Sequence, residues 1–405
     1  MTTLQPSDAV TLHEYQETHG VTLTSAQARA LASFRFQAVN APGATAMRVV
    51  DVSPASGPGT YNLRANSIVG SVAVAGLDVN ILPKSGVGRT AQMLAYSMGL
   101  ARFLRDDSAF ADARSLSALL VPAFLGRTSI LIGQGLVEDY VPIVETGTQP
   151  RGRIDFTALA RTGLPSPLEY GYDDFVADTP HNRLVARGLH AVTDMRLISP
   201  SLHAEARRLL ASLTDVAFID SPALFAGGWL PDRTRHYRDS LTLASLILRG
   251  AGIEPKPSTR RVRGLLFDMN RVFEDFVTAI VRSQVTDGLS VDAQGAAHPM
   301  HLDTRQRLRL RPDFAVWDRF GCQLVGDVKY KIMDAKKGPR RPDIYQIVNY
   351  AVAAGSDRAL LIYAGNGSGT DIEVVFPHVN IEVRALDDDR PIAQNEADVR
   401  SMLRP

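Results

Sequence analysis

The spacing of apolar residues changes twice along this chain of 405 residues, and that change excludes one regular architecture from end to end. Before Thr90, runs rich in Val and Ile, such as Met47–Val52 and Ser67–Leu82, alternate with Gly, Asn and Pro, which is typical of strands. From Thr90 onwards the apolar residues follow helical spacing. After the proline-containing stretch Gly250–Ser258, a mixed pattern of helices and strands begins. We therefore predict a multidomain α+β protein.

Three segments follow from these changes in spacing. We expect a β-rich N-terminal domain at residues 1–90, a helical middle region at residues 91–257, and a C-terminal α/β domain at residues 258–405. The second boundary rests on Pro255 and Pro257, because prolines with glycines favour linkers. A chain of this length has room for two or three domains.

The middle region should consist mainly of helices. Ser115–Tyr140 is predicted to form one or two buried helices, broken near Pro122 and near Gly133–Gly135. Asp178-Thr-Pro180 is a typical helix start, with a capping residue followed by proline. Three further helices are expected at His181–Leu197, Ser201–Leu213 and Ser240–Arg249.

The C-terminal segment begins with an apolar stripe at helical spacing, which predicts a helix. The stripe consists of Leu266, Met269, Phe273, Phe276 and Ile280. A second helix is predicted at Ile344–Ala354. Strands are predicted at Leu308–Val316, Gln323–Tyr330, Ala359–Tyr363 and Asp371–Phe376. This order of elements indicates an α/β domain with a mixed sheet.

Composition excludes several classes of protein and site. Cys322 is the one cysteine, so neither an intramolecular disulfide nor a cysteine-based zinc site can form, and a reducing cytoplasm is expected. The apolar stretches on either side of Arg127 are shorter than the about 18–20 residues of a membrane span, so none is expected. The 44 basic and 43 acidic residues exclude a globally basic polymer binder but not a local basic face. The Gly-rich loop of nucleotide motors does not occur in the sequence.

Two acidic residues and a lysine are the strongest candidates for catalysis. Asp313 lies on one predicted strand, and Asp327 lies two residues before Lys329 on the next. Because side chains alternate along a strand, Asp327 and Lys329 share a face. Two carboxylates that meet across neighbouring strands suit Mg²⁺, which would polarise a phosphodiester, and Lys329 could orient the attacking water or stabilise negative charge. The alternative is two aspartates in solvated turns or ion pairs, although charge within an apolar strand is costly without a use.

Three more residues are candidates for the same site. Glu274 lies at the edge of the apolar stripe, where its carboxylate can point toward the strand ends and join the metal ligands; the alternative is a surface glutamate. Gln346 and Tyr350 are four residues apart on a predicted helix and share a face. They could hold a water, a phosphate or a catalytic side chain, and the alternative is an ordinary helix surface.

Four arginines precede the first aspartate at alternate positions. On a strand, Arg305, Arg307, Arg309 and Arg311 would form one positive stripe. Such a stripe suits contacts with a DNA backbone. The alternative is a solvated edge strand whose charges prevent aggregation.

The residues of the candidate site resemble a known motif. Pro312-Asp313 with Asp327-Val-Lys329 resembles the PD-(D/E)xK nuclease superfamily, and Gln346-Ile-Val-Asn-Tyr350 is similar to the motif that follows it in the RecB-like branch. The surrounding sequence resembles the McrC subunit of modified-cytosine restriction systems. The stretches that carry this resemblance are Ile81–Lys84, Arg151–Asp155, Asp178–Arg183, Phe267–Phe276, Asp327–Lys331 and Arg341–Gln346. Val328 departs from the small residue often found inside the Asp-x-Lys triplet.

The resemblance implies a Mg²⁺-dependent endonuclease that cuts double-stranded DNA in antiviral defence, with a C-terminal PD-(D/E)xK domain. The site residues that it implies are Asp313, Asp327, Lys329, Glu274, Gln346 and Tyr350. It also implies an McrB-like AAA+ GTPase partner, which recognises and translocates DNA and is stimulated by the N-terminal part of this chain. Two other functions stay open: a non-catalytic activator of an NTPase ring, and a RecB-like DNA repair nuclease.

Overall fold

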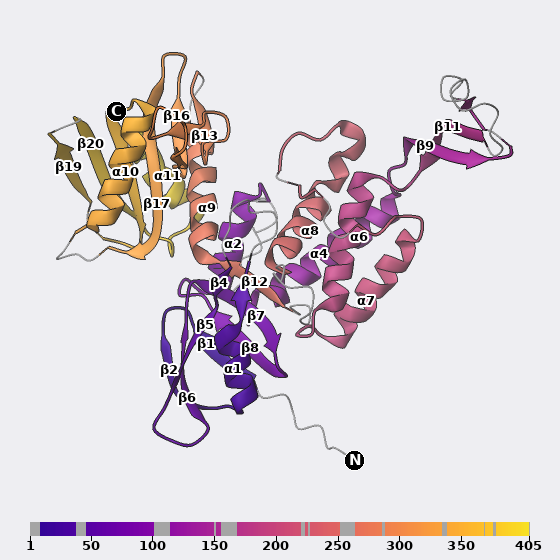
Figure 1. The fold of residues 1–405 in the computed structure, drawn as a ribbon, viewed down its shortest axis with the longest axis horizontal. Coiled ribbons are helices and arrows are strands. Elements are labelled where there is room, and N and C mark those ends of the chain that lie inside the picture. Colours follow the sequence, from indigo (N-terminus) through magenta and orange to yellow (C-terminus); the bar gives the residue numbers. More distant parts are fainter. Residues whose placement is uncertain are drawn as a thin grey trace. The chain divides into compact units, whose positions relative to one another are not determined.

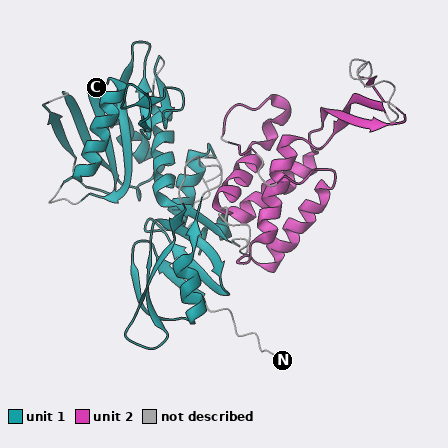
Figure 2. Ribbon diagram, in the orientation of Figure 1, with its two compact units in different colours: residues 1–37, 44–119, 253–405 teal, residues 38–43, 120–252 magenta. Residues whose placement is uncertain are grey.

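The computed structural model divides into two compact units (Figure 2). Unit 1 comprises residues 1–37, 44–119 and 253–405, and unit 2 comprises residues 38–43 and 120–252. The residues whose structure is described are 9–37, 46–100, 114–149, 151–154, 168–219, 223–225, 227–251, 264–285, 288–333, 338–367, 369–375 and 378–404. Most of the predicted linker at Gly250–Ser258 therefore lies outside the described residues.

The N-terminal part of unit 1 contains a four-stranded sheet in the order β1-β8-β7-β12 (Figure 1). Its strands are β1 (Ala9–His13), β7 (Ile68–Val74), β8 (Leu77–Leu82) and β12 (Leu265–Asp268). β1 is parallel to β8, and β7 is antiparallel to both β8 and β12. Gly70 lets β12 approach, because a Cβ at this position would lie 2.1 Å from the carbonyl oxygen of Leu265.

Smaller elements complete this part of unit 1. They are β2 (Glu17–Thr22), α1 (Ser25–Ser33), β3 (Arg35–Phe36), β4 (Met47–Arg48), β5 (Val50–Pro54), β6 (Thr60–Ala65) and α2 (Val87–Ser97). The sheet order β2-β6-β5 and the pair β3-β4 agree with the strands predicted before Thr90. The helical spacing predicted from Thr90 is confirmed in α2, where Met93 and Leu94 are buried. The residues after Leu100 to which that prediction extended lie outside the described residues.

The C-terminal part of unit 1 contains a six-stranded sheet in the order β13-β16-β17-β18-β20-β19. Its strands are β13 (Ser290–Ala293), β16 (Phe314–Trp317), β17 (Cys322–Ile332), β18 (Arg358–Ala364), β19 (Thr370–Val374) and β20 (Val379–Leu386). β16 is antiparallel to β17, whereas β18 is parallel to both β17 and β20. The predicted mixed sheet is therefore confirmed.

Two helices cover opposite faces of this sheet. Helix α10 (Arg341–Ala354) packs on the face that carries Leu361 and Tyr363 of β18. These residues pair in register with Asp327 and Lys329 of β17, so the predicted shared face of that pair points toward α10. Helix α9 (Met269–Gln284) packs on the other face, where its Phe273 ring lies 5.5 Å from the ring of Tyr330.

Several expectations for the C-terminal segment need correction. The apolar stripe is not one helix from Leu266, because Leu266 belongs to β12 and α9 begins at Met269, capped by the side chain of Asp268. Strand β20 and helix α11 (Ile392–Leu403) were not predicted. The division into compact units also differs from the three expected segments, since β12 lies beyond the expected second boundary yet pairs with β7.

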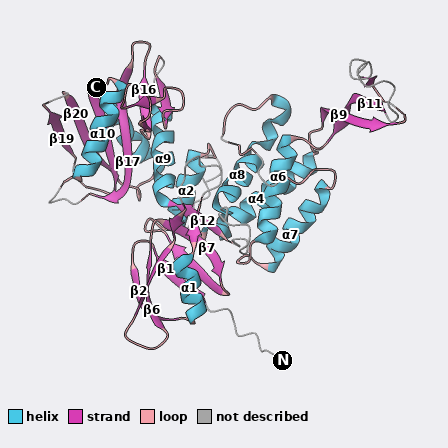
Figure 3. Cartoon of the chain, in the orientation of Figure 1, coloured by secondary structure: helices cyan, strands magenta, loops and turns pink. Residues whose placement is uncertain are grey.

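Unit 2 is built around helices (Figure 3). They are α4 (Leu116–Gln134), whose first residues belong to unit 1, α6 (Pro180–Asp194), α7 (Pro200–Leu210), η2 (Ala211–Leu213), η3 (Asp232–Tyr237) and α8 (Arg238–Ala251). The three helices predicted after Asp178 are confirmed. Thr179 caps α6 by accepting a hydrogen bond from the backbone of Asn182, as the sequence predicts. Gly188 allows close packing, because a Cβ there would lie 2.9 Å from the ring of Phe124 on α4.

A β-sheet in unit 2 was not predicted. It has the order β10-β11-β9 and consists of β9 (Asp139–Gly147), β10 (Arg153–Ile154) and β11 (Leu168–Val176). β9 and β11 pair antiparallel along their whole lengths. The middle region, which was predicted to consist mainly of helices, therefore also contains a sheet. Its two long strands were not predicted, because neither β9 nor β11 has a regular alternation of buried and exposed residues.

Helix α4 contradicts the predicted break at Pro122, because the helix continues through this residue to Gln134. With 19 residues and a mean hydropathy of 1.6, α4 would be long and apolar enough to cross a membrane, judged by length and composition alone. In unit 2 its Phe124, Leu125 and Thr128 are completely buried. Packing in the core of this unit accounts for the apolar composition of α4.

Candidate active site

Strands β16 and β17 bring Asp313 and Asp327 together. Phe314 pairs with Gly326 across the two strands, so the aspartates on either side of this pair lie next to each other. Each carboxyl group affects the pKa of the other. Asp327 is 1% exposed and Asp313 is 8% exposed. Burial, together with the charge of Asp313, raises the pKa of Asp327 to about 7, and burial also raises the pKa of Asp313.

Lys329 completes this cluster on the same face of β17. Its Nζ lies 2.7 Å from Oδ2 of Asp327, and its side chain is only 16% exposed. Burial alone would lower the pKa of Lys329, but the charges of Asp327 and Asp313 outweigh it and hold that pKa above its ordinary value. The lysine is therefore a positive charge fixed beside two carboxyl groups.

Backbone and side-chain donors hold Asp313 in place. Its Oδ2 accepts a hydrogen bond of 2.7 Å from the backbone N–H of Val328, the residue between Asp327 and Lys329. Its Oδ1 accepts a hydrogen bond of 3.0 Å from Nε2 of Gln294. Gln294 was not among the residues predicted from the sequence, and the one available signal was its position before a glycine, Gly295.

Glu274 reaches the cluster from helix α9. Its side chain is 25% exposed, and burial followed by the charge of Asp313 raises its pKa to about 9. Arg271 lies 3.9 Å away on the same helix and opposes this shift. Glu274 is therefore a partly buried carboxyl group whose charge interacts with that of Asp313, and not an isolated surface glutamate; its role as a metal ligand stays a prediction.

Gln346 and Tyr350 lie together on helix α10. Nε2 of Gln346 donates a hydrogen bond of 2.7 Å to the hydroxyl oxygen of Tyr350, so the predicted shared face is confirmed. Tyr350 is buried, and burial raises its pKa, with contributions from the charges of Asp327 and Asp313. The charges of the carboxylate cluster therefore act on Tyr350, and Gln346 is hydrogen-bonded to Tyr350.

A second group of contacts ties α10 to the sheet, and sequence analysis did not predict it. Asp343 is buried in the first turn of α10 and accepts a hydrogen bond of 2.7 Å from the hydroxyl of Tyr363 on β18. Its other oxygen lies 3.7 Å from Nζ of Lys331 on β17. These contacts fix the start of the helix that carries Gln346 and Tyr350.

The four arginines do not form one stripe, so this prediction was wrong. Strands β14 (Met300–His301) and β15 (Arg309–Leu310) form an antiparallel pair, and only Arg309 of the four lies on a strand. Asp303 closes the turn between these strands by accepting hydrogen bonds of 2.7 Å from the backbone of Arg307 and Leu308. All four arginines are nevertheless exposed.

The donor set of the cluster fits Mg²⁺. Among the described residues, no three His, Cys, Asp or Glu side chains stand close enough together to enclose a metal ion. Mg²⁺ does not need such a cage, because one or two carboxylates often hold it while water and substrate phosphates fill its other positions. Asp313 and Asp327 supply two carboxylates, and burial is the main reason that their pKa values are raised, so their ionised forms are unfavourable without a nearby cation.

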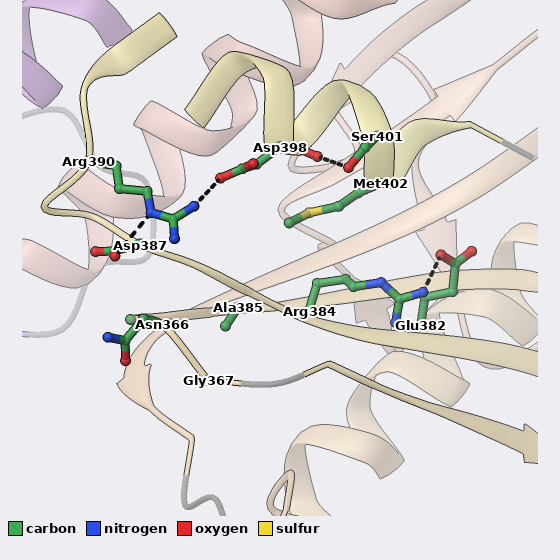
Figure 4. Close-up of a pocket in the computed structure, with 11 residues that line it drawn as sticks. Asn366, Gly367, Glu382, Arg384, Ala385, Asp387, Arg390, Asp398, Ser401 and Met402 are labelled. Carbon is green, nitrogen blue, oxygen red and sulfur yellow. Dashed lines mark hydrogen bonds and ion pairs between the residues drawn. The ribbon is translucent and has the colours of Figure 1, made fainter. Parts of the chain in front are cut away.

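A separate pocket of about 290 Å³ lies near the C-terminal ends of β18 and β20 (Figure 4). Its arginines are already paired: Arg384 with Glu382 at 3.1 Å, and Arg390 with Asp387 at 3.4 Å and Asp398 at 3.5 Å. None of the predicted catalytic residues lines it. The carboxylate cluster, and not this pocket, is therefore the candidate active site.

Comparisons with known proteins find similarity over most of the chain. The family model of the McrBC 5-methylcytosine restriction system component matches residues 63–364, which include Asp313, Asp327 and Lys329. A chain in the refined half-complex from the tetradecameric assembly of Thermococcus gammatolerans McrB AAA+ hexamers with bound McrC is similar in fold. It has 15% sequence identity and a TM-score of 0.59, with 98% of this chain and 99% of that chain covered.

A chain in the cryo-EM structure of the Thermococcus gammatolerans McrBC complex has 17% identity and a TM-score of 0.44, with 69% of this chain and 89% of that chain covered. No curated protein matches the sequence.

Proposed function

The chain belongs to the McrBC 5-methylcytosine restriction system component family, and on this premise we propose that it is the nuclease subunit of such a system. In this proposal it is a Mg²⁺-dependent endonuclease that hydrolyses phosphodiester bonds of double-stranded DNA. Its C-terminal sheet and helices α9 and α10 would form a nuclease domain of the PD-(D/E)xK type.

The observation that carries the proposal is the buried contact between Asp313, Asp327 and Lys329. Burying charged groups is unfavourable, and a purely structural ion pair needs only one carboxylate for one ammonium. Here a second carboxyl group lies against the first, and the pKa of Asp327 is raised to about 7. Such an arrangement is typical of functional sites, where a ligand or a metal relieves the excess charge.

Asp313 and Asp327 would hold the metal ion, and Glu274, whose charge interacts with that of Asp313, would join them directly or through a water. When bound, Mg²⁺ supplies a Lewis acid that polarises a phosphodiester and lowers the pKa of a water. Lys329 holds its ammonium at the edge of this carboxylate pair, where it can orient the attacking water or stabilise charge that develops on phosphate. Gln346 and Tyr350 limit the site on the α10 side and orient groups within it.

We propose an McrB-like AAA+ GTPase as the partner that recognises and translocates DNA. The neighbour with a similar fold comes from an assembly of McrB AAA+ hexamers with bound McrC. The sequence of this chain contains no nucleotide-binding loop of the Gly-x4-Gly-Lys-Ser/Thr type, which agrees with a motor supplied by another subunit. The N-terminal part would contact and stimulate that motor.

Asp327→Asn tests the proposal, because it removes the charge of one ligand and keeps the shape of the side chain. With the AAA+ partner, GTP and Mg²⁺, DNA cleavage should fall by at least about 100-fold, while stimulation of the partner's GTP hydrolysis should stay unchanged. Asp389→Asn, the same change at an exposed position of the same segment, is the control. Normal cleavage by the Asp327 variant would exclude this active site and favour a non-catalytic activator.

A further inference from the structure

The turn between β13 and β14 places a glutamine in an unusual conformation. Gln294 has φ of +57° and Gly295 has φ of +60°, and the backbone N–H of Ala296 donates a hydrogen bond of 3.2 Å to the carbonyl of Ala293. Two consecutive residues with positive φ and this closing bond are typical of a type I′ turn. Asn-Gly is the preferred pair in such turns, because Asn tolerates positive φ better than Gln does.

The side chain of Gln294 leads directly to the candidate active site. Its Nε2 donates a hydrogen bond of 3.0 Å to Oδ1 of Asp313. The backbone N–H of Val328 donates to the other carboxylate oxygen at 2.7 Å. One oxygen accepts a hydrogen bond from the turn after β13 and the other accepts one from β17, so the plane of the carboxylate is fixed and each oxygen keeps a lone pair for a cation.

Further contacts hold the turn in its strained conformation. The carboxylate of Asp292 accepts hydrogen bonds from the backbones of Ala296 at 2.9 Å, Ala297 at 3.1 Å and His298 at 2.7 Å. The guanidinium of Arg309 donates a hydrogen bond of 3.2 Å to the carbonyl of Gly295. Strained backbone persists where the surroundings over-determine it, and such positions are concentrated at functional sites.

We propose that Gln294 is a positioning residue, which holds the Asp313 carboxylate in the orientation that a divalent cation requires. The inference rests on the proposed function and extends it to a residue outside the Asp-Asp-Lys set. If this residue served the turn alone, Asn would be the more stable choice, because Asn suits the backbone conformation better. The side chain of Asn is, however, one methylene too short to keep the contact with Asp313. The extra methylene of glutamine is what brings the amide to the carboxylate.

Gln294→Asn and Gln294→Ala test this proposal, with binding of Mn²⁺ or Mg²⁺ by the full chain measured by calorimetry in the absence of DNA. Loss of a group that orients a metal ligand weakens metal binding by about 10-fold or more. Both variants should show this loss, and the thermal stability of the Asn variant should equal or exceed that of the wild type. Gln306→Ala is the matched control, because Gln306 also has φ of +57° but is exposed in the neighbouring turn.

The outcomes separate the role of Gln294 from the proposed function. If metal affinity is unchanged in both variants while Asp327→Asn abolishes binding, Gln294 is not a positioning residue and the metal site still stands. If only the Ala variant loses affinity, Gln294 acts through the turn and not through its amide, which also overturns the proposal. If Asp327→Asn binds the cation as well as the wild type does, the metal site itself is wrong.

Discussion

Glu14, which directly follows β1, accepts a hydrogen bond of 3.3 Å from the hydroxyl of Tyr330, the residue after Lys329 on β17. The same carboxylate oxygen accepts a hydrogen bond of 3.1 Å from the backbone of Lys84, whose Nζ lies 3.8 Å from the centre of the Tyr330 ring. Lys84 ends the stretch Ile81–Lys84, which contributed to the family resemblance. The N-terminal sheet therefore contacts the strand that carries two of the candidate catalytic residues.

Replacing Glu14 by Gln should change how stability depends on pH. Glu14 is 2% exposed, and burial raises its pKa from 4.5 to about 7. Between these values the folded protein binds a proton that the unfolded chain does not bind, so wild-type stability falls as pH rises from 5 to 8. The Gln side chain does not titrate. Between pH 5 and pH 8 the free energy of unfolding of the variant should therefore rise, relative to that of the wild type, by at most about 3 kcal/mol.

Urea unfolding at pH 5 and pH 8 measures this difference in the free energy of unfolding. Glu17→Gln, at an exposed position of β2, controls for the loss of one carboxylate. An equal destabilisation by Glu14→Gln at both pH values would contradict the prediction, since it would mean that the carboxyl group contributes only its hydrogen bonds.

Gly326→Ala should destabilise the C-terminal sheet strongly. A Cβ at this position would lie 2.0 Å from the ring of Phe314, which is completely buried. Overpacking of this kind costs about 3 kcal/mol, and denaturant unfolding should show the loss. Gly126→Ala in α4 is the control, because its Cβ would meet nothing within 4 Å and an exposed helical alanine should be neutral or slightly stabilising. A stable Gly326 variant would mean that the Phe314 ring can move away from β17.

Local periodicity explains why much of the candidate site could be predicted from the sequence. The alternation of side chains along a strand placed Asp327 and Lys329 on one face, and the helical repeat placed Gln346 beside Tyr350. Both inferences depend only on residues within a few positions of each other. The contact between Asp313 and Asp327 needed the further assumption that consecutive strands pair, which is common for sequential strands.

Contacts that depend on a single side chain or a distant partner could not be predicted in this way. The arginine stripe was wrong because the carboxylate of Asp303 turns the chain before Arg309, and alternation alone does not reveal such a turn. β12 was missed because its partner β7 lies in the N-terminal sheet. Gln294 was missed because its role depends on a left-handed backbone conformation that a glutamine rarely adopts.

Asp343 and Tyr363 should be energetically coupled. Their hydrogen bond of 2.7 Å is buried, and removing either partner leaves a polar group unpaired at a cost of about 1–3 kcal/mol. A double-mutant cycle of Asp343→Ala and Tyr363→Phe should give a coupling energy of at least about 1 kcal/mol, measured by urea unfolding. Both single variants should also lower DNA cleavage, because α10 carries Gln346 and Tyr350.

Tyr345→Phe supplies the control for this cycle, since Tyr345 lies on the same helix and is 65% exposed. Its stability change should be small and should add to that of Asp343→Ala. Strict additivity for the Asp343 and Tyr363 variants would show instead that the start of α10 is held by other contacts.

The arginines of the β14–β15 turn should contribute unequally to DNA binding. Among the described residues Arg305 has no ion-pair partner, whereas Nε of Arg307 lies 3.1 Å from the carboxylate of Asp303 and is partly neutralised. Binding of duplex DNA to the full chain, with Ca²⁺ in place of Mg²⁺ and at several salt concentrations, measures the number of phosphate contacts. Arg305→Ala should reduce the slope of log affinity against log salt by about 1, and Arg307→Ala should reduce it by less. Arg309 is unsuitable for this comparison, because it also holds the turn that presents Gln294. Equal slopes for the wild type and both variants would place the DNA backbone elsewhere on the chain.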